Sequence, residues 1–147
     1  MRDIVFKAKR IDNGEWVEGF LLIKYYQELP HDRFAIRYKT KGDEHEWTPK
    51  YLTTEINPET VCQYTGLTDM NGNKIWENDI ICTDVGNVRV AYVTDPSPYE
   101  NHYNAGFEVL FANVTDNENY RHDLGYWAIL RGFEVVGNTF DNPELWK

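Results

Sequence analysis

Apolar and polar residues alternate along much of this chain, in short runs separated by turn residues. The segment "DIVFKAKRIDNGEWVEGFLLIKYY" reads as a hairpin, because Ile4, Phe6 and Ala8 alternate on one face and Asp12–Gly14 is a strong turn signal. Gly19, inside the returning strand, indicates a bulge or a close approach of another backbone. The pattern therefore predicts an antiparallel hairpin at the N-terminus.

The same alternation predicts further strands, with turn residues between them roughly every eight to twelve residues. Two prolines suit single helical turns, Pro58 capped by Asn57 and Pro143 preceded by Asn142. The segments 126–130 and 133–140 form a predicted hairpin across "RG". The other predicted strands are Arg33–Thr40, 60–64, Asp79–Thr83, Asn87–Thr94 and 107–114.

About nine short strands in all favour a barrel or sandwich over an α/β fold. We predict a mainly β chain, with an N-terminal antiparallel sheet and a small C-terminal barrel. A soft boundary near Asn57–Gln63 separates two subdomains, residues 1–57 and 58–147. At 147 residues, the chain is long enough for one domain to bury a core without disulfides or metal.

Composition supports this picture and restricts the partners. Aromatic residues make up 15% of the chain, which fits half-buried β surfaces. The net charge is −9, and an acidic surface disfavours nucleic-acid binding. The N-terminus lacks the apolar core of a signal peptide and no apolar run is long enough to span a bilayer, so we expect a cytoplasmic protein. Cys62 and Cys82 are then expected to be buried thiols in strands.

The stretch "QYTGLTDMNGNKIWENDII" concentrates acids and amides, and three interpretations compete. As a calcium loop, Asp69, Asn71 and Asn73 occupy the first oxygen positions, but Lys74 and Ile80 stand where Gly and Glu are required. As a catalytic pair, Glu77 and Asp79 lack an apolar setting that would separate their pKa values, and exposed turn acids are favoured.

The turn interpretation accounts for more of this stretch. Asn71-Gly72 is the preferred pair for a two-residue turn with positive φ at both positions. Asp69 can accept from backbone N–H groups two residues on, and Gly66 permits a bend. The polar residues then serve the backbone rather than a reaction.

Other catalytic chemistry is weakly indicated. Ser97 lies in "PSP" and lacks a glycine-flanked elbow, and Cys62 has no histidine tied to it by sequence. Four histidines are scattered along the chain, at His31, His45, His102 and His122. Only His102 and His122, in two long loops, offer a metal pair together with Asp123 or Glu100. We expect solvated loop residues, with no cofactor, no metal and no catalytic residue.

A basic, tyrosine-containing stretch near the N-terminus gives a nucleic-acid alternative. Its aromatic members are Tyr25, Tyr26 and Tyr38, which make a small stacking surface conceivable. Ordinary solvent-facing positions are the favoured explanation. The basic residues are Lys7, Lys9, Arg10, Arg33, Arg37, Lys39 and Lys41.

Three segments, "FKAKRIDNGEWVEGFLL", "INPETVCQYTGLTDMNGNKIWENDII" and "EVVGNTFDNPELW", resemble the YopX-like family of phage and prophage proteins. Two departures stand out: Asn78 occupies a position where the family commonly has Gly, and Cys62 one where a small residue is usual. Asn tolerates positive φ, so the turn at Asn78 can survive. The signature residues carried by the resemblance are Gly66, Asp69, Asn71, Gly72 and Asp79.

The resemblance implies a mainly β fold whose C-terminal part looks like a small SH3-like barrel, and it implies no established activity. We therefore expect a non-enzymatic phage or prophage accessory protein of the bacterial cytoplasm that binds a protein or self-associates. Trp76, Tyr99 and Trp146 would be its exposed anchors, since Trp and Tyr dominate interface hot spots. The alternatives are nucleic-acid binding by the basic N-terminal sheet, or mimicry of DNA charge by the acidic C-terminal part.

Overall fold

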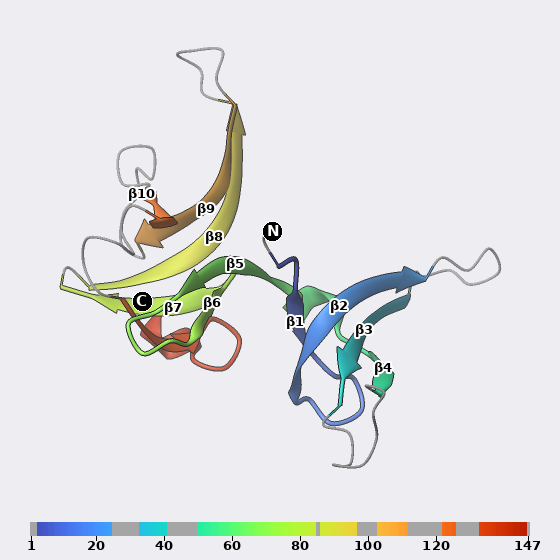
Figure 1. The fold of residues 1–147 in the computed structure, drawn as a ribbon. Helices are drawn as coiled ribbons and strands as arrows, with labels where there is room; N and C mark the ends of the chain where they lie inside the picture. The colour runs from blue at the N-terminus through green and yellow to red at the C-terminus, as the bar shows by residue number, and fades with distance from the viewer. Residues whose placement is uncertain are drawn as a thin grey trace. The chain divides into compact units, whose positions relative to one another are not determined.

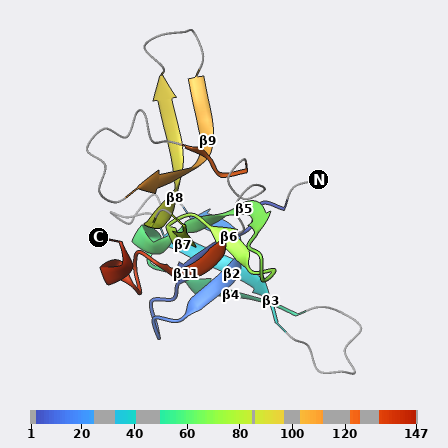
Figure 2. The same ribbon diagram turned by 90° about the vertical axis from the view of Figure 1, so that its left-hand side faces the viewer.

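The computed structural model describes residues 3–24, 33–40, 50–84, 86–96, 103–111, 122–125 and 133–146. These residues are mainly β, as the alternation predicts, and form antiparallel sheets (Figures 1 and 2). The strands are β1 (Phe6–Lys9), β2 (Trp16–Lys24), β3 (Arg33–Lys39), β4 (Tyr51–Glu55), β5 (Cys62–Thr68), β6 (Lys74–Trp76), β7 (Asp79–Thr83), β8 (Gly86–Pro96), β9 (Tyr103–Phe111), β10 (His122–Asp123) and β11 (Glu134–Asn138).

The chain divides into two compact units, Met1–Tyr64 and Thr65–Lys147. The division falls inside β5, whereas the subdomain boundary expected from sequence lies at residues 57 and 58. Two short 3-10 helices stand where the prolines predict helical turns, η1 (Pro58–Thr60) and η3 (Pro143–Leu145). The Asn57 side chain caps η1 by accepting from the Glu59 N–H at 3.0 Å.

In the N-terminal unit the strand order is β4-β3-β2-β1-β5. The Asp12–Gly14 turn signal does join β1 to β2, and Phe6 and Ala8 face the core as expected. An isolated bridge between Arg10 and Ile56 links the end of β1 to the residue after β4, so the sheet curls toward its own edge. The buried core of this unit contains Ala8, Val17, Ile36 and Ile56.

At Gly19 the backbones of β2 and β3 lie close together. A Cβ atom built there would lie 2.3 Å from the carbonyl oxygen of Arg37 and 2.9 Å from a methyl carbon of Ile36. No side chain fits at that distance, so the glycine is what allows β2 to pack against β3. The close approach expected from sequence is confirmed.

In the C-terminal unit a five-stranded antiparallel sheet has the order β10-β9-β8-β7-β11. Its longest pairing joins β8 and β9 in continuous register from Val88–Phe111 to Pro96–Tyr103, and both views show these strands side by side (Figures 1 and 2). The core of this unit is Ile75, Ile81, Val88, Val90, Val109, Leu124 and Phe133.

Several sequence expectations need correction or stay open. Ile4 precedes β1 and is exposed, and Cys82 is exposed although Cys62 is buried. Both differences arise because strand ends and one face of each sheet meet solvent. The described strands of the C-terminal unit form no closed barrel, so the SH3-like barrel stays a prediction. The predicted hairpin joins 126–130 to 133–140, and its first strand lies outside the described residues. The second strand contains β11, which pairs with β7.

Replacing Gly19 with Ala is expected to destabilise the N-terminal unit by roughly 1–3 kcal/mol, because the new methyl group would overpack against the Arg37 carbonyl. Urea unfolding followed by circular dichroism measures the change. Gly106→Ala is the matched control, since a Cβ there would meet nothing within 4 Å. Equal stability of the two variants would contradict the close approach.

Candidate functional site

The loop between β5 and β6 is organised by the carboxylate of Asp69, which is only 6% exposed. Asp69 Oδ1 accepts from the backbone N–H groups of Asn71 and Asn73, at 2.9 and 2.8 Å. Asp69 Oδ2 accepts from the Asn73 side-chain amide at 3.1 Å and from the Val135 N–H at 3.2 Å. One carboxylate therefore ties its own loop to β11, which is 66 residues away in the chain.

The electrostatics of Asp69 follow from these bonds. Burial opposes the charged form, but the hydrogen bonds from the side chain and backbone of Asn73, and from the Val135 and Asn71 backbones, outweigh it and lower the pKa of the carboxyl. A carboxylate with four N–H donors stays ionised at neutral pH. It is a fixed anchor for backbone donors, not an acid or base poised for proton transfer.

The turn at Asn71-Gly72 differs from the one expected from sequence. Among the described non-glycine residues only Asn78 has positive φ, so Asn71 does not, while Gly72 has φ 83°. Bonds from the Asp69 N–H to the Asn73 carbonyl and from the Gly72 N–H to the Asp69 carbonyl enclose three loop residues. The predicted two-residue turn is therefore wrong: the Asp69 carboxylate selects a three-residue loop with one positive φ.

The other signature residues also serve the backbone. Gly66 has φ 87°, which permits the bend within β5. Asn78, at φ 66°, tolerates the conformation for which the family commonly uses Gly. Asp79 is 2% exposed and accepts from the Trp76 N–H at 2.8 Å, so the expectation of exposed turn acids is wrong for Asp79, while Glu77 is half-buried. The Asp79 carboxylate is buried because it accepts a backbone N–H group that would otherwise lose its partner.

The closing segment, which contains "VVGN" and "NPEL", packs against other residues of the C-terminal unit. The Asn87 side-chain amide donates to the Leu145 carbonyl at 3.0 Å, and the guanidinium of Arg89 lies 5.6 Å from the Trp146 ring centre. A Cβ at Gly137 would meet the Asn142 side chain at 2.5 Å. The part of the resemblance that closes the chain is thus also explained by packing.

The predicted interface anchors within the described residues differ in exposure. Trp76, on β6, is buried with only 4% of its surface exposed, so the prediction of an exposed anchor is wrong. Lys74 Nζ lies 5.5 Å from the centre of its ring. Trp146 is half-buried beside Arg89. Tyr99 lies outside the described residues.

The histidines cannot be placed as a metal pair. His31, His45 and His102 lie outside the described residues, as do Ser97 and Glu100, and only the backbone of His122 and Asp123 is described, as β10. Within the described ranges no group of three or more His, Cys, Asp or Glu side chains could hold a metal ion.

A different surface emerges from the registers of the N-terminal sheet. Ala8, Val17 and Ile36 point into the core, so their neighbours along each strand point to the opposite face. We call this opposite surface, formed by β1 to β4, the outer face. Its aromatic residues are Trp16, Phe20 and Tyr51.

Cations and aromatic rings lie together on the outer face. Lys7 Nζ is 5.0 Å and Lys9 Nζ 5.5 Å from the ring centre of Trp16. The Arg37 guanidinium is 5.5 Å from the ring centre of Tyr51, and Arg37 is also the register partner of Phe20. Phe20 is 57% and Tyr51 44% exposed, so both rings meet solvent on this face.

The charge of the outer face opposes that of the whole chain. Acidic residues on the face are limited to Glu18 and Glu55, and Glu55 pairs with Arg33 at 2.8 Å. Its six cations give the face a formal charge of +4, although the chain carries −9. The cations are Lys7, Lys9, Lys24, Arg33, Arg37 and Lys39.

This face overlaps only partly with the basic stretch found in the sequence. Tyr38 packs against the core and is not part of it, and Tyr25, Tyr26 and Lys41 lie outside the described residues. Sequence analysis missed the roles of Trp16, Phe20 and Tyr51. The signal that would have found Trp16 and Phe20 is their offset by one position from the core residues of the same strand.

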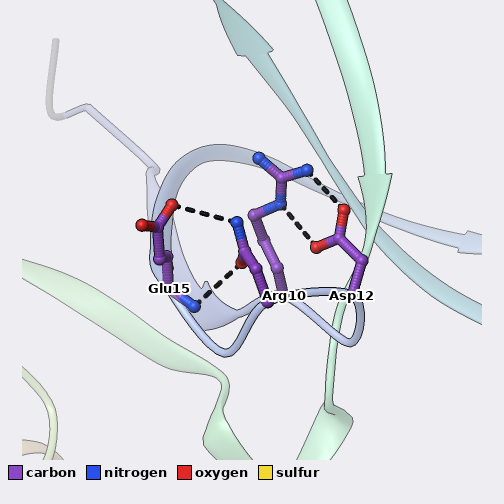
Figure 3. A network of polar contacts seen from close by, with 4 residues as sticks. Arg10, Asp12 and Glu15 are labelled. Atoms are coloured by element: carbon purple, nitrogen blue, oxygen red, sulfur yellow. Dashed lines mark hydrogen bonds and ion pairs between the residues drawn. The ribbon is translucent and has the colours of Figure 1, made fainter.

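Arg10 lies apart from the outer face, in the loop between β1 and β2 (Figure 3). Its guanidinium donates two hydrogen bonds to the Asp12 carboxylate, which raise the pKa of Arg10 and lower that of Asp12. Beside it the Asn13 side chain bonds both the backbone and the side chain of Glu15. These contacts shape the loop and neutralise Arg10 locally.

Residues 6–147 match the family model described as YopX protein. The chain belongs to the YopX family. A comparison with curated proteins gave no match. Among solved structures, the YopX chain is similar to protein EF1440 from Enterococcus faecalis, with 21% identity, a TM-score of 0.54 and full coverage of both chains. That likeness supports the fold alone. In the described ranges no helix has the length and apolarity needed to cross a membrane.

Asp69→Asn is expected to destabilise the C-terminal unit by about 2 kcal/mol or more, because the amide cannot accept all four N–H groups and leaves buried donors without partners. Urea unfolding at pH 7 measures the loss. Asp12→Asn, which alters an exposed pair, is the control and is expected to change stability far less. Comparable losses in the two variants would contradict the anchoring role.

The lowered pKa of Asp69 also predicts a pH dependence. Its stabilising effect should be fully present above the ordinary aspartate value, about 3.9, and should fade as the pH falls through the lower value of the folded state. The difference in unfolding free energy between wild type and Asp69→Asn should therefore be constant from pH 7 to 5 and shrink below pH 4. A difference that instead grows as the pH falls from 7 to 4 would mean that the folded-state pKa is raised.

Proposed function

We propose that this YopX-family chain is a non-enzymatic binding module that recognises an anionic partner through the outer face of its N-terminal sheet. The observation that carries the proposal is the gathering of six cations around Trp16, Phe20 and Tyr51 on one face of an otherwise acidic chain. The expected phage or prophage origin and cytoplasmic location belong to the same proposal. So does an SH3-like C-terminal barrel, which the five antiparallel strands of that unit support.

The distribution of charge supports an anionic partner. The unit Thr65–Lys147 holds thirteen acidic and five basic residues, a formal charge of −8. The unit Met1–Tyr64 holds eleven acidic and ten basic residues, so it is nearly neutral overall. At physiological salt the Debye length is about 8 Å, so a ligand on the outer face responds mainly to nearby charges.

The proposal that the chain is not an enzyme rests on the chemistry of its best-defined polar cluster. Asp69 is occupied by backbone and amide donors, and Asp79 accepts from the Trp76 backbone. The hydrogen bonds that both carboxylates accept therefore explain their burial. The acidic C-terminal unit stays a candidate for mimicry of DNA charge, but five of its acids from Asp95 to Asp123 have side chains outside the described ranges.

A second candidate, self-association, is favoured by the position of β4. This strand ends the sheet order of the N-terminal unit. The Ile11 N–H donates to the Glu55 carbonyl at one end of its second edge, and no other described strand pairs with the rest of that edge. Tyr51 and Leu52 on it are both more than 40% exposed. A second copy adding a strand there would bury them. Multi-angle light scattering at micromolar concentration should then give the mass of two chains, and a mass of one chain would exclude it.

Binding of inorganic polyphosphate, a polyanion without bases, tests the anionic-partner proposal. Calorimetry should detect binding at 50 mM salt that weakens steeply as salt rises. The double variant Arg37→Gln, Lys39→Gln should lose affinity several-fold because two cations leave the outer face. Lys74→Gln, a cation of β6, is the control and should bind nearly as wild type. Absence of binding by the wild type, or equal loss in the control, would contradict the proposal.

A further inference from the structure

The outer face combines cations with exposed aromatic rings, and binding of a simple polyanion would require only the cations. Cations are sufficient to attract phosphates, and exposed rings on a sheet are costly to leave in water. Phe20, at 57% exposed, lies in the centre of the sheet on β2, flanked by the register partner Arg37 on β3. An aromatic ring in such a place is best explained by a ligand that covers it.

Bases of a single strand are ligands of this kind. Each base offers a flat π surface that stacks on an aromatic side chain, while the phosphates next to it pair with Lys and Arg. In a duplex the bases are stacked on one another and shielded, so exposed rings on a sheet gain nothing from it. We propose that the outer face binds single-stranded nucleic acid, with bases stacked on Phe20 and Tyr51.

The geometry of the strands suits a chain of nucleotides. Trp16 and Phe20 lie four residues apart on β2, which is about 13 Å along an extended strand. Tyr51 lies on β4, two strands across from Phe20, with Arg37 between them as the neighbour of both rings. The rings are therefore spread over the face with cations between them, as a backbone crossing the sheet requires.

The cations near the rings assist stacking. Arg37 lies 5.5 Å from the ring centre of Tyr51, so its guanidinium can share a base with that ring or pair with the adjoining phosphate. Lys7 and Lys9 hold similar positions around Trp16. A base bound here would meet an aromatic surface and a positive charge at once.

This inference rests on the proposed function, and one binding series separates the two. Fluorescence anisotropy is measured with labelled oligothymidine of twelve nucleotides, an abasic strand of equal length, the corresponding duplex and polyglutamate. The single strand should bind roughly tenfold or more tightly than the abasic strand, because each stacked base contributes. With four to six phosphates contacted, log K should fall against log salt with a slope of about −3 to −4.

Phe20→Ala and Tyr51→Ala should each weaken oligothymidine binding about tenfold while leaving binding of the abasic strand unchanged. Unchanged abasic binding also shows that the variant is folded. Ile23→Ala is the matched control: Ile23 lies three residues from Phe20 on β2, is 43% exposed, and points to the opposite face of the sheet. It should leave both affinities unchanged.

Two sets of results would overturn the inference. If the abasic strand, the duplex or polyglutamate binds as tightly as oligothymidine, stacking is absent and only the anionic-partner proposal survives. The same holds if Ile23→Ala matches Phe20→Ala. If no probe binds at 50 mM salt, the proposed function fails as well.

Discussion

The constraint on which the C-terminal unit depends is the burial of one charged carboxylate. Asp69 is removed from water, which is unfavourable for a charge unless hydrogen bonds replace the lost hydration. Four N–H donors do so, and one of them belongs to Val135, far away in the sequence. The loop that closes the β5–β6 hairpin and the edge strand β11 are therefore held by the same side chain. The burial of Asp79, at the next turn between β6 and β7, follows the same rule, with the Trp76 N–H as its donor.

The burial of these carboxylates bears on which unit is a candidate for binding. The acids and amides of the C-terminal unit that look most like a catalytic site are occupied by the backbone, and the closing segment packs through Asn87, Arg89 and Gly137. In the N-terminal unit the core cluster of Ala8, Val17, Ile36 and Ile56 lies on one face of the sheet. The other face carries exposed rings and cations besides the buried Ala35. We therefore propose that binding belongs to the outer face, apart from the polar cluster that holds the C-terminal unit together.

Sequence patterns predicted much of this fold because strand period and turn chemistry are local. The bounds of β7, the cap at Asn57 and the close approach at Gly19 were all signalled by nearby residues. The positive φ at Asn78 was expected from the family resemblance. The loop at Asp69 was only half predicted, since its geometry depends on which donors the carboxylate collects. The burial of Trp76 and Asp79 could not be read from spacing, because both depend on how the C-terminal unit packs around β6. The outer face was hidden for the same reason: Tyr51 joins it only through the pairing of β4 with β3.

The central claim is that the signature around Asp69 builds the fold while the outer face of the N-terminal sheet binds. Amide chemical-shift mapping by NMR during titration with oligothymidine tests it most directly. The account predicts shifts concentrated on β2, β3 and β4, around Phe20, Arg37 and Tyr51, with the loop from Asp69 to Asn73 unaffected. Shifts concentrated in that loop, or spread over the Thr65–Lys147 unit, would contradict it.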